Sequence, residues 1–172
     1  MVISSEIQCS VHSPNAFIQT HLRRLLPDWT VPVLSVLIVL QRPCVSLVSH
    51  TSDAESSKDT LRDRFIALGY DVVHRLEERG YLADLFDPRT GFPLLSLPGS
   101  IRLDDVAVAH SMLGYDKADV GGCISLLHPI WGQTVYPSTL VSSARPYHLA
   151  QVVAASLGDR PPTSNHLEYV FR

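Results

Sequence analysis

The sequence predicts a single α+β domain in which a mainly antiparallel sheet carries helices packed on it. Its 172 residues are 45% hydrophobic and 18% charged, which suits one domain with a sizeable core and excludes wholesale disorder. Stretches with helical spacing alternate with short apolar runs bounded by turn residues, and parallel βαβ crossovers do not dominate their order. The domain is expected to cover residues 1–158, and residues 159–172 to form a poorly ordered polar tail.

The first part of the chain predicts a helix followed by two strands. Ser13 and Pro14 suit the N-cap and the first turn of a helix, which Pro27 ends. Residues 31–40 are rich in Val, Leu and Ile and predict a buried strand. Residues 45–49 predict a second strand, so we expect the two to form an antiparallel hairpin.

A long helix is predicted over residues 59–79, after a polar loop at residues 52–58. Gly80 stands where a C-terminal cap belongs. Gly69 lies inside the helix and weakens it by about 1 kcal/mol relative to alanine, so packing must compensate. The apolar stripe that predicts this helix consists of Leu61, Phe65, Leu68, Val72 and Leu76.

A second hairpin and a short helix follow. Residues 81–86 and 92–96 flank a D-P-x-x-G turn at residues 87–91, in which proline fixes one dihedral and glycine is free to adopt a positive φ. The short helix is predicted over residues 104–113, with Asp104 near its positive end.

A third hairpin and a last helix complete the predicted domain. The strands are residues 123–128 and residues 133–143, and the second is bent or edge-placed at Pro137, because proline cannot donate to a ladder. The helix opens with proline, runs over residues 146–157 and ends at Gly158.

Charge and cysteine content narrow the classes of function. Seventeen acidic residues against fourteen basic ones give a net charge of -3, so no nucleic-acid partner is expected. The longest apolar run, residues 31–40, is too short for a bilayer that needs ~20 helical residues, so no membrane partner is expected either. Three cysteines without a CxxC motif favour a reducing compartment. With no leader visible at the start, the cytoplasm is the expected location.

Strong catalytic signatures are absent from the sequence. It contains no P-loop, nucleophile elbow, HExxH or GxGxxG motif, and its eight histidines are scattered. Asp84 and Asp87 are interpreted as a solvent-facing or strand-pairing residue and a turn residue rather than as an acid/base pair. The acidic residues around the short helix resemble caps more than catalysts: Asp104, Asp105, Asp116 and Asp119. An aromatic side chain can stack on a ring-shaped ligand or fill the core, and both readings stay open for Tyr81, Tyr115, Trp131 and Tyr136.

Cys123 is the most interesting candidate for chemistry. It follows Gly121 and Gly122, which let the backbone approach a flat ligand closely and leave the thiol accessible at the mouth of a loop. The alternative, which the residue pattern alone favours, is a small buried hydrophobe at the start of a strand. Cys9 and Cys44 have no supporting feature.

Several motifs occur together: GYLADLFDP at residues 80–88, LGY at residues 113–115, DVGGC at residues 119–123 and HPIWG at residues 128–132. In order and spacing they resemble the C-terminal domain of the CblD cobalamin trafficking family, the family of the methylmalonic aciduria and homocystinuria type D protein (MMADHC). The resemblance covers most of residues 6–145. It implies an α+β domain similar to the flavin-dependent nitroreductases, which uses no flavin and has no enzymatic activity of its own.

The resemblance also implies a partner and a route. Proteins of this family bind the cobalamin-processing protein CblC and help to pass cobalamin toward methionine synthase in the cytosol and methylmalonyl-CoA mutase in mitochondria. No cofactor is therefore expected on the chain alone, and cobalamin is expected through a complex with a CblC-like partner. The family's N-terminal extension, which carries targeting, has no counterpart in this sequence, so we expect the cytosolic branch, with the mitochondrion as the alternative.

In this family a cysteine thiolate coordinates the cobalt of partner-bound cobalamin. The resemblance therefore makes Cys123 the expected cobalt ligand and Gly121, Gly122 and Cys123 the expected cobalamin-contacting residues. The family's loop often reads Gly-Cys-Cys, with the ligand at the first cysteine, where this sequence has Gly122. A shift of one residue on a regular strand turns the side chain to the other face. Either the loop is irregular enough for Cys123 to substitute, or the cobalt–sulfur bond has been lost.

Two other functions remain open at this point. A flavin-dependent reductase of nitroreductase-like fold is motivated only by the inferred architecture, and no basic cluster stands ready for the flavin phosphate. The other is an interaction module that keeps the fold and has no role with cobalamin.

Overall fold

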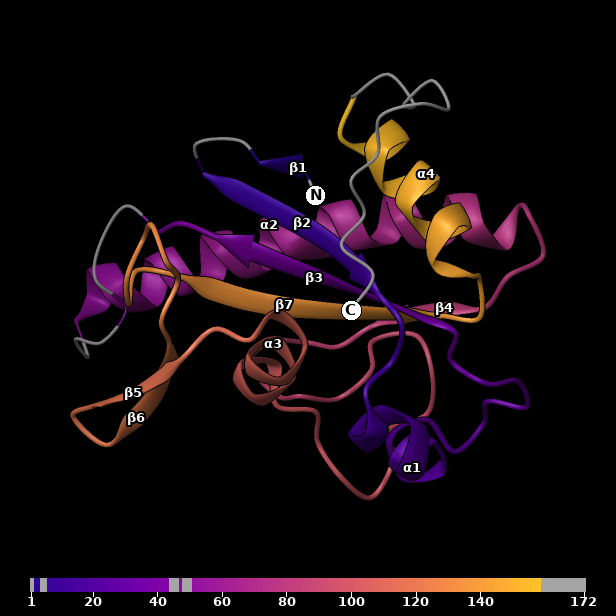
Figure 1. The fold of residues 1–172 in the computed structure, drawn as a ribbon, viewed down its shortest axis with the longest axis horizontal. Helices are drawn as coiled ribbons and strands as arrows, with labels where there is room; N and C mark the ends of the chain where they lie inside the picture. Colours follow the sequence, from indigo (N-terminus) through magenta and orange to yellow (C-terminus); the bar gives the residue numbers. More distant parts are fainter. Residues whose placement is uncertain (1, 4–5, 44–46, 48–50, 159–172) are drawn as a thin grey trace.

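The computed structural model describes residues 2–3, 6–43, 47 and 51–158, and it confirms the predicted α+β class (Figure 1). A five-stranded antiparallel sheet has the order β1-β2-β3-β7-β4, and β5 and β6 form a separate two-stranded ribbon. In chain order the elements are β1 (Val2–Ile3), β2 (Ile7–His12), α1 (Ala16–Leu25), β3 (Ser35–Gln41), α2 (Ser52–Glu77), β4 (Ala83–Leu85), α3 (Asp105–Leu113), β5 (Lys117–Val120), β6 (Cys123–Leu126), β7 (Tyr136–Ser142) and α4 (Pro146–Ser156).

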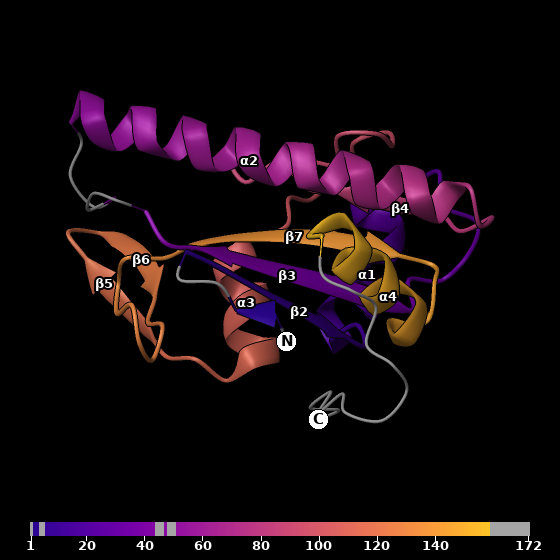
Figure 2. The same ribbon diagram turned by 90° about the horizontal axis from the view of Figure 1, so that it is seen from above.

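The helices cover both faces of the sheet. On one face α2 and α4 pack through Phe65, Val72 and Leu149, and on the other α1 and α3 pack through Ile18 and Val108. The long α2 lies along its face of the sheet in Figure 2. Every residue of the central strand β3 is buried, because both of its faces are covered and both of its edges are paired.

Two of the predicted hairpins are wrong as pairings. The strand predicted at residues 31–40 is β3, but its two neighbours are β2 and β7; the partner predicted at residues 45–49 lies outside the described residues except for Leu47. The strand predicted from Cys123 is β6, which pairs with β5 and not with β7. Neighbours in sequence are only the default partners of a strand, and β3 buries more apolar surface between two distant strands than beside one nearby.

The predicted loop at residues 52–58 is also wrong, because α2 begins at Ser52. Thr51 caps the helix by accepting a hydrogen bond from the Ala54 backbone N–H at 3.2 Å. Asp53 and Glu55 place negative charge in the first turn, where the helix dipole favours it. The N-cap of α1 is Asn15 rather than Ser13. The predicted cap of α3 by Asp104 is confirmed, and the helix ends as predicted at residue 113, where Gly114 with φ of 71° follows.

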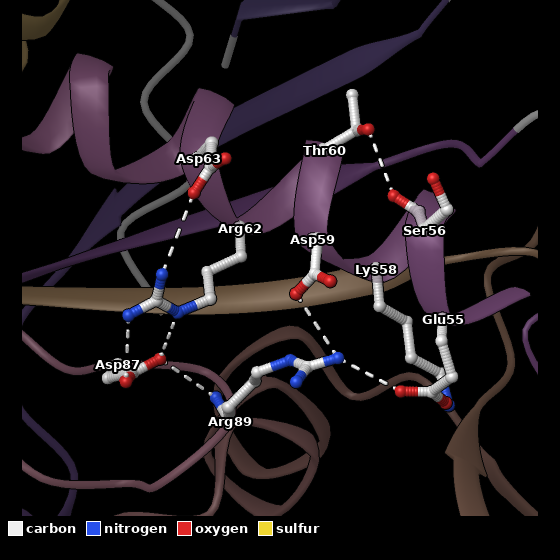
Figure 3. Close-up of polar contacts among 9 residues, drawn as sticks. All are labelled: Glu55, Ser56, Lys58, Asp59, Thr60, Arg62, Asp63, Asp87 and Arg89. Atoms are coloured by element: carbon white, nitrogen blue, oxygen red, sulfur yellow. Dashed lines mark hydrogen bonds and ion pairs between the residues drawn. The ribbon is translucent and has the colours of Figure 1, made fainter. Parts of the chain in front are cut away.

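The D-P-x-x-G turn forms as predicted, but its returning arm makes only one bridge, from Pro93 to Phe86. Inside the turn Gly91 N–H donates to the Asp87 carbonyl at 2.7 Å. Asp87 also accepts a two-pronged ion pair from Arg62 of α2, at 2.7 and 3.1 Å (Figure 3). Arg89 reaches α2 as well, at Glu55 and Asp59; the first half of α2 is thereby tied to this turn.

Gly69 is explained by the close approach of α2 to β4. A Cβ atom at this position would lie 2.6 Å from Leu85 Cδ1, so only glycine lets the helix sit this low on the strand. The described part of the chain contains no helix that is both long and apolar enough to cross a membrane. The predicted tail at residues 159–172 lies outside the described residues.

Candidate functional site

The ribbon of β5 and β6 carries the glycine pair at its tip. Val120 lies opposite Cys123, so Gly121 and Gly122 are the two central residues of the tightest kind of hairpin turn. Their φ angles are 63° and 86°, and a type I′ turn requires positive values at both positions. Asp119 lies on β5 and caps no helix, so that prediction is wrong; its carboxylate accepts a hydrogen bond from the Gly122 N–H at 2.8 Å and holds the turn. The thiol therefore stands beside a turn held by both backbone geometry and a side chain.

Cys123 is exposed, so the alternative of a buried small hydrophobe is wrong. It is the first residue of β6, and the next side chain, Ile124, is 55% exposed. Gly122 occupies the position of the first cysteine in the family's Gly-Cys-Cys loop. Its φ is one that L side chains rarely adopt, because in this chain the position belongs to the turn. The open space around both turn glycines leaves the sulfur approachable from the tip.

The other cysteines do not compete with it. Cys9 lies in the core against α2 and α4, 3% exposed, and burial raises the pKa of its thiol to about 12. At neutral pH it therefore supplies no thiolate. Cys44 lies outside the described residues.

His128 and Trp131 have structural roles. The Nδ1 atom of His128 accepts hydrogen bonds from the backbone N–H groups of Ile130 and Trp131, at 3.1 and 3.0 Å, so the proton is on Nε2, which donates to Gln8. Burial lowers the pKa of His128, which keeps the ring neutral. Trp131 stacks on this imidazole with centroids 4.1 Å apart and is 9% exposed. Of the two readings of Trp131, the core plug beneath a turn is the one observed.

Asp84, Tyr81 and Tyr115 also have structural roles. Of the two readings of Asp84, strand pairing is confirmed, because Asp84 lies opposite Val141 in the pair of β4 and β7, and the solvent-facing one is wrong. The buried carboxylate accepts hydrogen bonds from the N–H groups of residues 94–96. Burial raises the pKa of Asp84. Tyr81 and Tyr115 pack against the two cores, and Tyr115 accepts a hydrogen bond from Gln8. These residues hold loops and layers in place.

A cleft of about 490 Å³ lies between β6 and the start of β7, and Cys123 lines it. We call it the β6–β7 cleft: its walls are β6, residues 135–137, the turn at residues 88–91 and the start of α3 at residues 102–106. Two strands predicted to pair thus diverge instead. No local sequence pattern indicates such a divergence, and the cleft was not predicted.

Asp105 and Tyr136 both line this cleft. The N-cap of α3 is Asp104, and Asp105 is the first residue of the helix, so the prediction of a cap-like role for Asp105 is wrong. Asp105 is 8% exposed, and burial raises the pKa of its carboxyl group to about 7. Tyr136 is 9% exposed, and burial together with the charge of Asp105 raises its pKa. Within the described residues, no group of three or more His, Cys, Asp or Glu side chains is arranged to hold a metal ion.

Comparison with protein families matches residues 2–154 to the family model of the methylmalonic aciduria and homocystinuria type D protein. The chain is also similar to the cobalamin trafficking protein CblD of Homo sapiens, with 22% identity over 143 residues, covering 83% of this chain and 48% of that protein. The protein of the same name in Mus musculus is 22% identical over 141 residues, covering 82% and 48%. The one in Gallus gallus is 22% identical over 143 residues, covering 83% and 48%. The chain thus spans about half the length of the curated relatives it matches.

Proposed function

Since this chain belongs to the family of the methylmalonic aciduria and homocystinuria type D protein, we propose that it serves in intracellular cobalamin trafficking. In this proposal it is an adaptor without catalytic activity. It binds a CblC-like protein that holds cobalamin, and it helps to route the cofactor toward methionine synthase or methylmalonyl-CoA mutase. The cofactor reaches this chain only in the complex, and the adaptor acts in the cytoplasm.

The observation that carries the proposal is the exposed thiol at the tip of the ribbon. Cobalamin presented by another protein is a broad, flat ligand, so a sulfur that meets its cobalt must stand clear of surrounding side chains. Gly121 and Gly122 contribute to that clearance, because neither has a side chain and, apart from their neighbours in the chain, nothing lies within 4 Å of where a Cβ would be. The type I′ turn also fixes where Cys123 points, and a fixed ligand loses less conformational entropy on binding.

The chemistry is ligand exchange without oxidation or reduction. The thiolate of Cys123 would bind the cobalt of the cargo in place of a ligand that the cobalt already carries, and the thiol proton would pass to solvent. A thiolate is a soft ligand that suits this metal. The exposed Ile124 beside it supplies apolar surface for the partner or for the corrin edge.

The test mixes the purified chain with a CblC-like protein loaded with cobalamin and records the visible spectrum. We expect a spectral change for the wild type and for Cys9→Ala, whose thiol is buried and protonated, and none for Cys123→Ser. Equal changes in wild type and Cys123→Ser contradict the thiolate role. Absence of a complex on gel filtration contradicts the adaptor role, and a yellow protein that releases flavin on denaturation favours the reductase instead.

A further inference from the structure

The β6–β7 cleft exists because one edge of β7 is left open. Phe86 N–H donates to the Thr139 carbonyl, so the backbone groups of Thr139 face β4. Because backbone groups alternate along a strand, those of Pro137 face the same side as those of Thr139. β4 ends at Leu85 and does not reach Pro137. Proline has no N–H, so this edge presents no unpaired donor there, as the edge placement predicted for Pro137 requires. The space beside it is the cleft.

Two polar atoms beside this cleft have no hydrogen-bond partner: Asp105 Oδ1 and Tyr136 Oη. Both residues are more than nine-tenths buried, so neither atom is exposed to bulk water. Leaving such a group unsatisfied costs about 1–3 kcal/mol. The two come from different elements, the start of α3 and the start of β7, and both line the cleft that also holds Cys123.

The charges around the cleft select the kind of group that satisfies these atoms. Lys58 and Arg89 line the walls but are paired with Glu55 and Asp59 of α2. The opposite charges of Arg102 and Asp104, and a raised pKa that keeps Asp105 largely protonated below about pH 7, leave no net charge that favours an ion. A neutral group that both donates and accepts remains. A primary carboxamide has this pattern, because its NH₂ donates to the Asp105 carboxyl group and its carbonyl accepts from the Tyr136 hydroxyl.

We infer that the β6–β7 cleft is a binding site for a primary carboxamide, reached by small rotations of Asp105 and Tyr136. Resting on the proposed function, the amide is one of the acetamide or propionamide side chains at the rim of the corrin. Cobalamin then meets this chain at two points, its cobalt at Cys123 and a rim amide at the cleft floor. The second contact fixes how the corrin is turned about the cobalt–sulfur bond.

The amide site is tested without partner, cobalt or thiolate. Propionamide is titrated into the isotope-labelled chain, and amide chemical shifts are followed by NMR, with methyl propionate as the matched ester that cannot donate. We expect saturable shifts around residues 105 and 136 with the amide only. Tyr136→Phe removes an oxygen that bonds nothing in the structure, so the fold is kept, and it weakens propionamide binding by roughly three- to tenfold. Tyr70→Phe, on the exposed side of α2, leaves binding unchanged.

Two results overturn the amide site, whatever is found with cobalamin. One is equal chemical-shift changes with propionamide and methyl propionate; the other is changes that Tyr136→Phe leaves unaltered. A second arm measures binding to the CblC-like protein with and without cobalamin. We expect Tyr136→Phe to weaken binding to the loaded partner and not to the empty one. If propionamide binds as expected and Tyr136→Phe affects loaded and empty partner alike, the corrin assignment fails and the carboxamide site stands.

Discussion

Asp105→Asn should remove a large part of the pH dependence of stability above pH 5. The folded pKa of Asp105 is about 7, against 3.8 for an exposed carboxyl group, because burial disfavours the charged form. The folded state therefore holds a proton that the unfolded state has already lost in this window. Stability from this group is full below pH 3.8 and is lost as the pH rises through about 7.

The size of the effect follows from the width of that window. Between pH 5 and pH 8 the group passes through about two pH units in which the proton numbers differ, at 1.36 kcal/mol per unit, so it removes roughly 2.5 kcal/mol. Asn cannot titrate, so the wild type should lose about that much stability relative to Asp105→Asn between these pH values. Other titrating groups are common to both proteins and cancel in the comparison.

Urea unfolding at pH 5 and pH 8, followed by circular dichroism, measures the difference. Asp104→Asn is the matched control, because Asp104 is an exposed neighbour and Asn is an equally good N-cap. It should change the stability little and keep most of the pH dependence, because burial raises the pKa of Asp105 more than the charge of Asp104 does. An equal pH dependence for wild type and Asp105→Asn would refute the reasoning and show that the carboxylate is solvated in the native state.

Two further predictions concern the layers that carry the site. Gly69→Ala should destabilise the protein by a net of about 0–2 kcal/mol. The new Cβ meets Leu85 Cδ1 at 2.6 Å, and shifting this fully buried side chain costs about 1–3 kcal/mol, while alanine favours the helix by about 1 kcal/mol. Thermal unfolding measures the change, and a clear rise in Tm would show that Leu85 or α2 moves away freely. Asp84→Asn should cost about 1–3 kcal/mol, because an amide NH₂ replaces one of the oxygens that accept from the backbone N–H groups of residues 94–96. Urea unfolding tests it against Asp116→Asn, an exposed control, and equal stability of the two variants would mean that the loop does not depend on this carboxylate.

The sequence predicts the ends of a helix when neighbouring residues determine them. Asp104 and Gly114 bound α3, and a proline at the first helical position opens α4, because caps act within one turn. The start of α2 was missed because residues 52–58 show no apolar stripe, although Thr51 supplies a cap. The start of α2 is found when N-cap residues are sought before polar stretches as well as before stretches with an apolar stripe.

Strand pairing and half of the candidate site depend on distant parts of the chain. β2 was missed because it is short and includes Gln8 and Ser10, which are buried polar residues on a strand. Cys123 was found from its glycine neighbours, a local signal. Asp105 and Tyr136 form a candidate site only because α3 and β7 lie close together in the fold. No spacing in the sequence predicts that they are close.

The Arg62–Asp87 ion pair has a consequence for how the molecule moves. It anchors the turn at residues 88–91 to α2, so this wall of the β6–β7 cleft is held in place. Opposite it stands a ribbon of two short strands, whose outer edges pair with no other strand in the described part of the chain. A two-stranded ribbon is only marginally stable by itself, so its position depends on what it packs against. If the cleft widens, we therefore expect the ribbon to move as one unit, with the turn keeping the orientation of Cys123 within it.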